Sequence, residues 1–327
     1  MISSVSNPKY ILGSEIFRFS SVSTKLLFIY FKPPVSEAMC LVAAKVLLPP
    51  PFFKSNDKVT VEKRQIKSYD GYDLTVYVIS PRGIKEPCPC LVNFHGGGFV
   101  FEGAPHHYRL AMLYAQKAEC KAIYVKYRLA PKYKYPVAFE DCFAALKWTY
   151  ENADELGIAP DNIGVGGDSA GGTLAAAVCH MNKDRQTNIP IRFQLLAYPF
   201  LDIRNSSESA KKYKDTPMWN SRLSDKVKPL ILSGYTDKPV YLSPVEIENL
   251  SGLPEAYIET CEFDCLHDDG ISYNKLLMEN GIKTELFETS GTMHGYDIVL
   301  KAPVTLKAIN KRTEYMKRIF SKENINI

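Results

Sequence analysis

The sequence predicts an α/β fold in which helices cover both faces of a mainly parallel β-sheet. Beyond residue 58, short stretches with the apolar pattern of strands alternate with stretches of helical spacing over many units. Pro89–Phe94 is a nearly continuous apolar run, typical of a strand that is buried on both faces. Such an alternation favours a parallel sheet wrapped by helices. With 327 residues, 46% of them hydrophobic, the chain can form one large α/β domain.

Two stretches of helical spacing come first in the chain, at roughly 20–31 and 36–48. Pro33-Pro34 separates them and Pro49–Pro51 ends the second, because proline removes a backbone donor and clashes with the preceding turn. Residues 1–55 are either an extension that covers the core or helices of a cap over an active site. We favour N-terminal cap helices, with the catalytic domain at 56–327.

The N-terminal region also contains the apolar run Leu26–Phe31. This run is far shorter than the ~20 apolar residues that span a membrane. Lys32-Pro33-Pro34 follows it in place of the small residues of a cleavage site. We therefore expect no secretory signal, no stable membrane insertion and a cytoplasmic location.

From residue 59 the apolar period changes to two, and Asp70-Gly71 between two alternating stretches predicts a β-hairpin. The polar stretch at about 202–240 breaks the later alternation, and we interpret it as an insertion of helical pieces that adds to the cap. The expected strands are 59–66, 74–79, 89–94, 122–127, one that ends at the glycines near 167, 191–198, 255–260 and 284–288. The expected helices are 106–118, 139–156, one that ends at about 183, 268–280 and 303–320.

Charge and motif content exclude several classes of function. The formal net charge of +4 is spread along the chain without a basic stripe, so we expect no nucleic-acid partner. The eight cysteines are scattered and form no zinc-finger pattern, which is typical of reduced thiols in an intracellular protein. No G-x-G-x-x-G or Walker pattern is present, so a nucleotide-phosphate site has no support.

The segment Gly167-Asp168-Ser169-Ala170-Gly171 fits the pattern G-x-S-x-G of a nucleophile elbow. It lies between an apolar run and a stretch of small residues and leucine at helical spacing, as a strand-turn-helix elbow requires. In such a turn the serine hydroxyl stands clear of neighbouring side chains. We predict Ser169 as the nucleophile.

A serine hydroxyl needs a base, and the base needs an orienting carboxylate. In this kind of fold both partners follow the serine, acid first, on loops after later strands. His294 has the right order and loop position for the base, and Asp264 for the acid. Asp268 and Asp269 are rivals of Asp264 that we expect to cap the next helix. His180 and His267 are expected to be structural.

The tetrahedral intermediate of acyl transfer needs N–H donors for its oxyanion. The segment His95-Gly96-Gly97-Gly98 follows a buried strand, and its glycines let a carbonyl group approach the backbone closely. We expect donors from this loop together with the N–H group of Ala170. His95 is expected to brace the loop rather than to take part in the chemistry.

Taken in order, these segments resemble the hormone-sensitive-lipase family of α/β-hydrolases, which are GDSAG-type esterases. Seven segments between about residue 60 and the end carry the resemblance: His95–Gly98, Tyr127–Pro131, Pro136–Cys142, Gly167–Gly171, Ser243-Pro244, Asp264 and His294-Gly295. The acid loop departs from the usual Asp-Pro-Leu-Arg-Asp-Glu, because Asp264 is followed here by Cys-Leu-His-Asp-Asp.

The resemblance implies an α/β-hydrolase fold with an eight-stranded-type sheet and a helical cap formed by the N-terminus and the insertion. It implies a Ser169–Asp264–His294 triad and oxyanion donors at Gly97, Gly98 and Ala170, with Gly96 as a further candidate. It favours hydrolysis of short- to medium-chain acyl esters, including acetyl esters, through an acyl-enzyme that needs no metal or organic cofactor. Candidate pocket residues are Phe99, Phe101, Tyr198, Trp219 and Met293.

Other functions stay open at this point. Plant gibberellin receptors resemble this family but have lost the catalytic histidine, so a non-catalytic protein that binds a small ligand is one alternative. The presence of His294 with Ser169 and Asp264 argues against it. Carbohydrate O-deacetylation, acyl transfer to another alcohol and amide hydrolysis use the same triad. The resemblance is also compatible with a homodimer through the sheet edge or the last helix.

Overall fold

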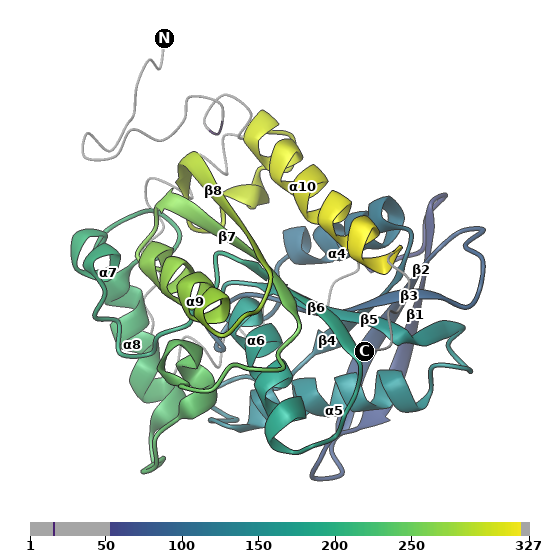
Figure 1. Ribbon diagram of the computed structural model, residues 1–327, viewed down its shortest axis with the longest axis horizontal. Coiled ribbons are helices and arrows are strands. Elements are labelled where there is room, and N and C mark those ends of the chain that lie inside the picture. The colour runs from purple at the N-terminus through teal and green to yellow at the C-terminus, as the bar shows by residue number, and fades with distance from the viewer. Residues whose placement is uncertain (1–15, 17–52, 322–327) are drawn as a thin grey trace.

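An eight-stranded sheet forms the centre of the molecule in the computed structural model, which describes residues 16 and 53–321 (Figure 1). The strand order is β1-β2-β4-β3-β5-β6-β7-β8, and only β2 runs antiparallel to its neighbours. The strands are β1 Val59–Lys67, β2 Asp73–Pro81, β3 Cys88–Phe94, β4 Lys121–Lys126, β5 Ile158–Asp168, β6 Ile191–Ala197, β7 Glu255–Phe263 and β8 Thr284–Met293. The predicted α/β-hydrolase class and the mainly parallel sheet are confirmed.

Helices cover the sheet on both faces (Figure 1). They are α4 Pro105–Ala118 and α10 Pro303–Phe320 on one face, and α5 Val137–Glu151, α6 Ala170–Asp184 and α9 His267–Glu279 on the other. Successive side chains of a strand point to opposite faces, so β3 contributes to both cores. Leu91 packs into the cluster with Tyr114 and Met316, whereas Val92 packs into the cluster with Leu146 and Ala175.

The predicted hairpin is present, with Ile66 opposite Leu74 and Gly71 at a positive φ of 81° in the turn. Two element ends differ from expectation. The helix expected over 139–156 ends at Glu151, because the side chain and backbone of Asn152 both bond to the Trp148 carbonyl group. Strand β8 continues beyond 288 to residue 293, since its polar end still pairs with β7.

The 202–240 insertion contains helices α7 Glu208–Lys212 and α8 Ser221–Leu232, and α7 packs against α9 (Figure 1). Its contact with α9 corrects the expected capping role of two aspartates. Helix α9 begins without a side-chain cap, and Asp268 accepts a hydrogen bond from the Ser209 N–H at 2.7 Å. Burial, together with Asp202, raises the pKa of Asp269 well above its usual range. Both aspartates therefore face the insertion rather than cap the helix.

The expected cap helices at 20–31 and 36–48 lie outside the described residues, and so does most of the 1–55 segment. Ile16 is described, and it is fully buried in a cluster with Tyr198, Met293 and Tyr296. This point of the N-terminal segment therefore packs beneath the loop that carries His294.

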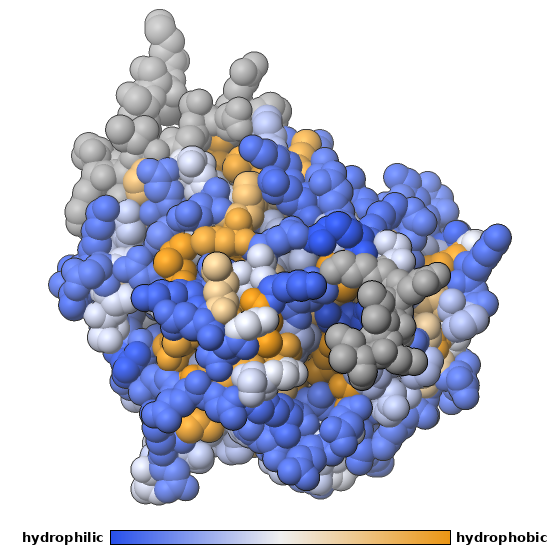
Figure 2. Space-filling model, viewed as in Figure 1, coloured by the Kyte–Doolittle hydropathy of each residue, from blue (hydrophilic) through white to orange (hydrophobic). Residues whose placement is uncertain are grey.

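The face of the molecule in Figure 2 is largely hydrophilic, with hydrophobic residues in scattered patches. Within the described part of the chain, no helix combines the length and the apolar character needed to cross a membrane. The seven described cysteines are all buried, and none of them forms a disulfide.

A buried charge network joins α10 to the sheet. Arg312 is fully buried and donates to Glu259 on β7 at 2.9 Å and to Asp297 at 2.9 Å. Both carboxylates are also fully buried, and Arg312 further donates to the Tyr114 hydroxyl group on α4. The remaining Asp297 oxygen accepts from the Tyr198 hydroxyl group at 2.6 Å. The Arg312 guanidinium therefore holds the carboxylates of Glu259 and Asp297 in place, and Asp297 belongs to the segment that follows His294.

Replacing Arg312 by methionine leaves Glu259 and Asp297 buried without their cation. We expect the free energy of unfolding to fall by about 3–5 kcal/mol in urea denaturation. Lys317→Met on the same helix removes an exposed pair with Glu119 and serves as the control, with an expected loss below ~1 kcal/mol. Equal small losses in the two variants would contradict a structural role for the network.

Candidate active site

Ser169 stands at the sharp turn between β5 and α6, with φ 54° and ψ −120°. A positive φ in a residue other than glycine costs roughly 1–3 kcal/mol and needs support from its surroundings. The Ser169 N–H donates to the Ala197 carbonyl group at 2.9 Å. A Cβ atom at Gly167 or Gly171 would collide with the backbone around Phe94. Glycines therefore let strand and helix close tightly around the serine, which is the geometry of a nucleophile elbow.

The side chains of Ser169, His294 and Asp264 form one hydrogen-bonded chain. His294 Nδ1 lies 2.7 Å from Asp264 Oδ2, and His294 Nε2 lies 2.8 Å from Ser169 Oγ. Because a carboxylate only accepts, Nδ1 carries the ring proton and Nε2 is free to accept from the serine hydroxyl group. The other Asp264 oxygen accepts from the Leu266 N–H at 3.0 Å, which fixes the carboxylate. All three side chains are buried.

The three come from the carboxyl ends of three parallel strands. Ser169 follows β5, Asp264 follows β7 and His294 follows β8. This edge of an open α/β sheet is the usual place for a ligand. The other histidines with assigned structural roles lie elsewhere: His180 is 3.0 Å from the Tyr273 hydroxyl group, and His267 contacts Asp268 and Glu288.

The glycine loop after β3 lies beside the elbow. Gly97 and Gly98 have positive φ angles of 121° and 59°, and the Gly97 carbonyl group accepts from the N–H groups of Val100 and Phe101. Ala170 is the first residue of α6, so its N–H has no partner within that helix. Gly96 differs from expectation, because its N–H donates to Asp168 Oδ2 at 3.1 Å and is not available for an oxyanion.

His95 braces this loop from below. Its Nδ1 contacts the Gly96 carbonyl group at 2.6 Å, and its own carbonyl group accepts from the Tyr127 hydroxyl group at 2.7 Å. Burial, with His107 nearby, lowers the pKa of His95 to about 3, so the ring is neutral at physiological pH. A buried neutral imidazole with these contacts supports the loop.

Asp168 and His107 are positioning residues that the sequence analysis missed. The same Asp168 oxygen that holds Gly96 lies 3.1 Å from His107 Nε2. His107 Nδ1 lies 2.8 Å from the Ala104 N–H; burial lowers the pKa of this imidazole, but the adjacent Asp168 carboxylate outweighs burial and raises it above its usual value. Burial raises the pKa of Asp168, but the adjacent His107 outweighs it and lowers this pKa to about 2. The carboxylate thus ties the glycine loop to the elbow.

The five candidate pocket residues take different places. Tyr198 packs edge-on against the His294 ring at 5.0 Å, and the Trp219 ring lies 6.2 Å from it. Phe101 is half-buried against the main core. Phe99 is buried and stacks on Phe139 in that core, and Met293 is fully buried in the cluster of Tyr198 and Ile16. Only the rings of Tyr198 and Trp219, of these five, contact the base.

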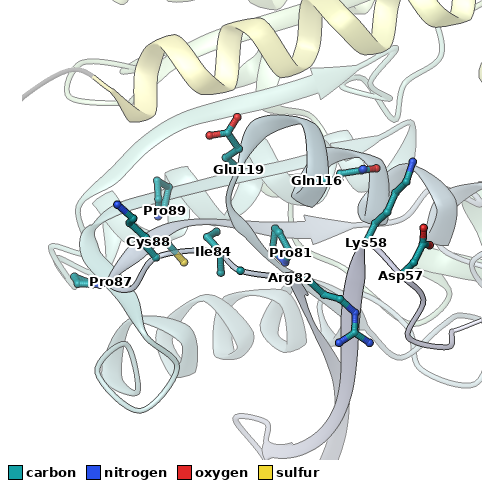
Figure 3. Close-up of a pocket in the computed structure, with 12 residues that line it drawn as sticks. Asp57, Lys58, Pro81, Arg82, Ile84, Pro87, Cys88, Pro89, Gln116 and Glu119 are labelled. Carbon is teal, nitrogen blue, oxygen red and sulfur yellow. The ribbon is translucent and has the colours of Figure 1, made fainter.

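A separate surface pocket lies at the start of β3 (Figure 3). Pro81, Cys88 and Gln116 are among its lining residues, and none of the triad residues belongs to it. Cys88 begins β3, so the pocket is at the amino end of this parallel strand, whereas ligands of such sheets bind at the carboxyl ends. Burial raises the pKa of the Cys88 thiol, which disfavours a thiolate there. Among the described residues, no His, Cys, Asp or Glu cluster is arranged to hold a metal ion.

A buried Asp–His–Ser chain at an elbow, beside a glycine loop, is the arrangement of a serine hydrolase. Consistent with it, the profile of a family described as alpha/beta hydrolase fold matches residues 91–298. That span is more than half of the chain, and the chain belongs to this family of α/β-hydrolases. The resemblance to hormone-sensitive-lipase-type esterases is confirmed.

Several relatives are named as esterases. Carboxylesterase NlhH of Mycobacterium tuberculosis is 36% identical over 268 residues, which cover 80% of this chain and 83% of the relative. An arylesterase of Saccharolobus solfataricus is 35% identical over 242 residues, covering 72% and 77%. Among solved structures, a bacterial heroin esterase has a TM-score of 0.81 at 28% identity, covering 95% and 99%. A thermostable esterase from Pseudomonas putida ECU1011 has a TM-score of 0.83 at 26% identity, covering 98% and 100%.

Asp168→Asn tests the link between the elbow and the glycine loop. The variant loses the charged anchor of Gly96, so we expect kcat to fall roughly 10- to 100-fold with little change in KM, as for a small displacement of catalytic groups. Steady-state kinetics with p-nitrophenyl acetate measure this. An unchanged kcat would contradict the positioning role of Asp168.

The pH dependence of stability gives a second test of this anchor. The folded pKa of Asp168, about 2, lies below its ordinary value of 3.8. The ionised carboxylate therefore stabilises the fold fully above pH 3.8, and this contribution is lost as the pH falls towards 2. In urea titrations, the stability difference between wild type and Asp168→Asn should be largest between pH 3.8 and 6.5 and narrow below 3.8. Because Asp168 raises the pKa of His107 above its ordinary value of 6.5, the difference should also narrow as the pH rises through that raised pKa. A difference that stays constant above pH 6.5 would mean that His107 is neutral and contributes only a hydrogen bond to Asp168.

Proposed function

We propose that this chain is a serine carboxylesterase that hydrolyses short- to medium-chain acyl esters, including acetyl esters, through an acyl-enzyme on Ser169. Hydrolysis of carboxylic esters is the activity of its relatives, and the chain is an ester-hydrolysing member of the family. The observation that carries the acyl-enzyme is the unbroken hydrogen-bond chain from Asp264 through His294 to Ser169.

Acylation follows from the directions of the hydrogen bonds. His294 Nε2 removes the proton from Ser169 Oγ as the oxygen attacks the ester carbonyl carbon. The carbonyl oxygen becomes an oxyanion, for which the N–H groups of Gly97, Gly98 and Ala170 are the proposed donors. The imidazolium, stabilised by Asp264, then gives its proton to the leaving alcohol, and the acyl group stays on the serine.

Deacylation repeats these steps with water in place of the serine. His294 takes a proton from water, whose oxygen attacks the acyl carbon, and the same donors hold the second oxyanion. The bond to Ser169 Oγ breaks as His294 returns the proton to it, and a carboxylic acid is released. The residues Ser169, Asp264 and His294 account for every proton transfer in this scheme.

The proposal also covers the acyl-chain pocket, the cellular location and the oligomeric state. The pocket that receives the acyl chain is proposed to lie against Tyr198, whose ring packs edge-on against His294. A cytoplasmic location is supported by the buried unpaired thiols of the described cysteines. A homodimer stays a prediction that size measurement in solution would test.

Hydrolysis of p-nitrophenyl esters from acetate to palmitate tests the proposed function. We expect turnover of the acetate to octanoate esters and little turnover of palmitate. Ser169→Ala should lower kcat by roughly 10⁶-fold, as for loss of the nucleophile in other serine hydrolases. A folded wild-type protein that turns over none of these esters would favour the ligand-binding alternative.

A second experiment tests which aspartate orients the base. Asp264→Asn keeps the shape of the side chain but lets His294 adopt the wrong tautomer, so kcat should fall by about 10⁴-fold. Asp268→Asn is the matched control, because that aspartate bonds to Ser209 and His267 outside the triad. Its kcat should stay close to that of wild type. The reverse ranking would assign the acid to Asp268.

A further inference from the structure

The indole ring of Trp219 touches both halves of the proposed catalytic machinery. A Cβ atom on Gly98 would collide with the six-membered part of this ring, so the indole packs directly on the glycine loop. The same ring lies 6.2 Å from the His294 imidazole, measured between ring centroids. Trp219 is only 6% exposed. One side chain of the insertion therefore fills the space beside both Gly98 and His294.

Hydrogen bonds hold this ring in place. Trp219 Nε1 donates to Ser224 Oγ on α8 at 3.0 Å, and both groups are buried. The Trp219 carbonyl group accepts from Thr216 Oγ1, and the Trp219 N–H donates to the Pro217 carbonyl group, each at 2.8 Å. Asn220 then caps α8 by accepting from the Leu223 N–H. Such a side chain has little freedom to turn away from the site.

Met218, the preceding residue, shows the same constraint in the backbone. Its φ of 66° is unusual for a residue other than glycine and costs roughly 1–3 kcal/mol. Its terminal methyl group lies next to Gly295, the residue after the base, and its side chain packs on the cluster of Met293 and Tyr198. Strained backbone is retained where the surroundings require it, and here it turns two adjacent side chains towards the His294 loop.

His294 thus contacts two aromatic rings of different origin. Tyr198 follows strand β6, and its ring is held through its hydroxyl group by Asp297 and, beyond it, Arg312. Trp219 comes from the insertion and is held by Ser224. The Tyr198 ring is fixed by the buried network of Asp297 and Arg312. The position of the Trp219 ring depends instead on the position of the insertion.

We propose that Trp219 is a positioning residue for the esterase reaction, which keeps the Gly98 loop and the His294 ring at their reactive spacing. The inference rests on the proposed function and assigns the insertion a part in the rate of the chemical steps. A ring that served only as a pocket wall would change ester binding and chain-length preference. A ring that positions the oxyanion loop and the base changes the rate of every ester alike.

Kinetics of Trp219→Ala on the acetate, butyrate and octanoate esters separate these roles. Misplaced catalytic groups lower kcat, so we expect a loss of roughly 100-fold that is similar for all three esters, with KM within about 3-fold of wild type. Trp219→Phe keeps an aromatic ring and should recover most of the rate. Unchanged kcat with a higher KM, or a loss confined to one chain length, would overturn the proposal.

Two further variants make the result with Trp219→Ala interpretable. Ser224→Ala keeps the indole but removes its anchor, so a smaller fall in kcat is expected even if Trp219→Ala folds poorly. Trp148→Phe, on helix α5, is the matched control and should leave kcat unchanged. Turnover by the wild type establishes the esterase independently, so the two proposals fail in different ways.

Fluorescence gives a readout without turnover, because Trp148 and Trp219 are the two tryptophans of the chain. In Trp148→Phe, all tryptophan emission comes from Trp219. Covalent reaction with a p-nitrophenyl alkylphosphonate, a serine-directed reagent, should change this emission in step with loss of activity. Trp148→Phe/Ser169→Ala should show no change. Constant emission during complete labelling would place the ring away from the reacting serine and overturn the proposal.

Discussion

The structure depends on the close approach of β5, α6 and β3 at the elbow. Gly167 and Gly171 leave no room for a Cβ atom against the backbone around Phe94, and this closeness keeps Ser169 at its positive φ. The strain is local, but the support comes from the sheet, because the Ser169 N–H bonds to β6. Asp264 follows β7 and His294 follows β8 of the same sheet, so the strand order sets the geometry of the triad.

Buried polar groups connect the loops that surround this serine. Asp168 accepts from the Gly96 N–H and from His107, which ties the glycine loop to the elbow. On the other side, Arg312 pairs with Glu259 and Asp297 behind the His294 loop. Burying such groups is costly unless all are bonded, so they define one arrangement of the loops rather than add much net stability. The insertion also bonds to the loop that carries Asp264, because Ser209 donates hydrogen bonds to Asp268 and to the Cys265 carbonyl group.

The sequence was sufficient to predict the elements whose residues have local signals. The period-two stretches and the continuous apolar run predicted the strands, and glycines around Ser169 predicted the elbow. The polar end of β8 was missed because its pairing with β7 depends on a partner distant in the chain. Asp168 and His107 gave no signal, since the variable position of G-x-S-x-G accepts many residues and their contact joins distant segments. Trp219 could be named only as an aromatic residue, because its contact with Gly98 requires the folded insertion.

The central claim is that Ser169 carries the acyl group during turnover. The most direct measurement is mass spectrometry of the wild-type protein quenched in acid during hydrolysis of p-nitrophenyl acetate, followed by peptide mapping. The mechanism predicts one added acetyl group per chain, located on the peptide that contains Ser169 and absent once the ester is consumed. Acetylation of another residue, or a burst of p-nitrophenol without a covalent acetyl group on Ser169, would contradict the mechanism.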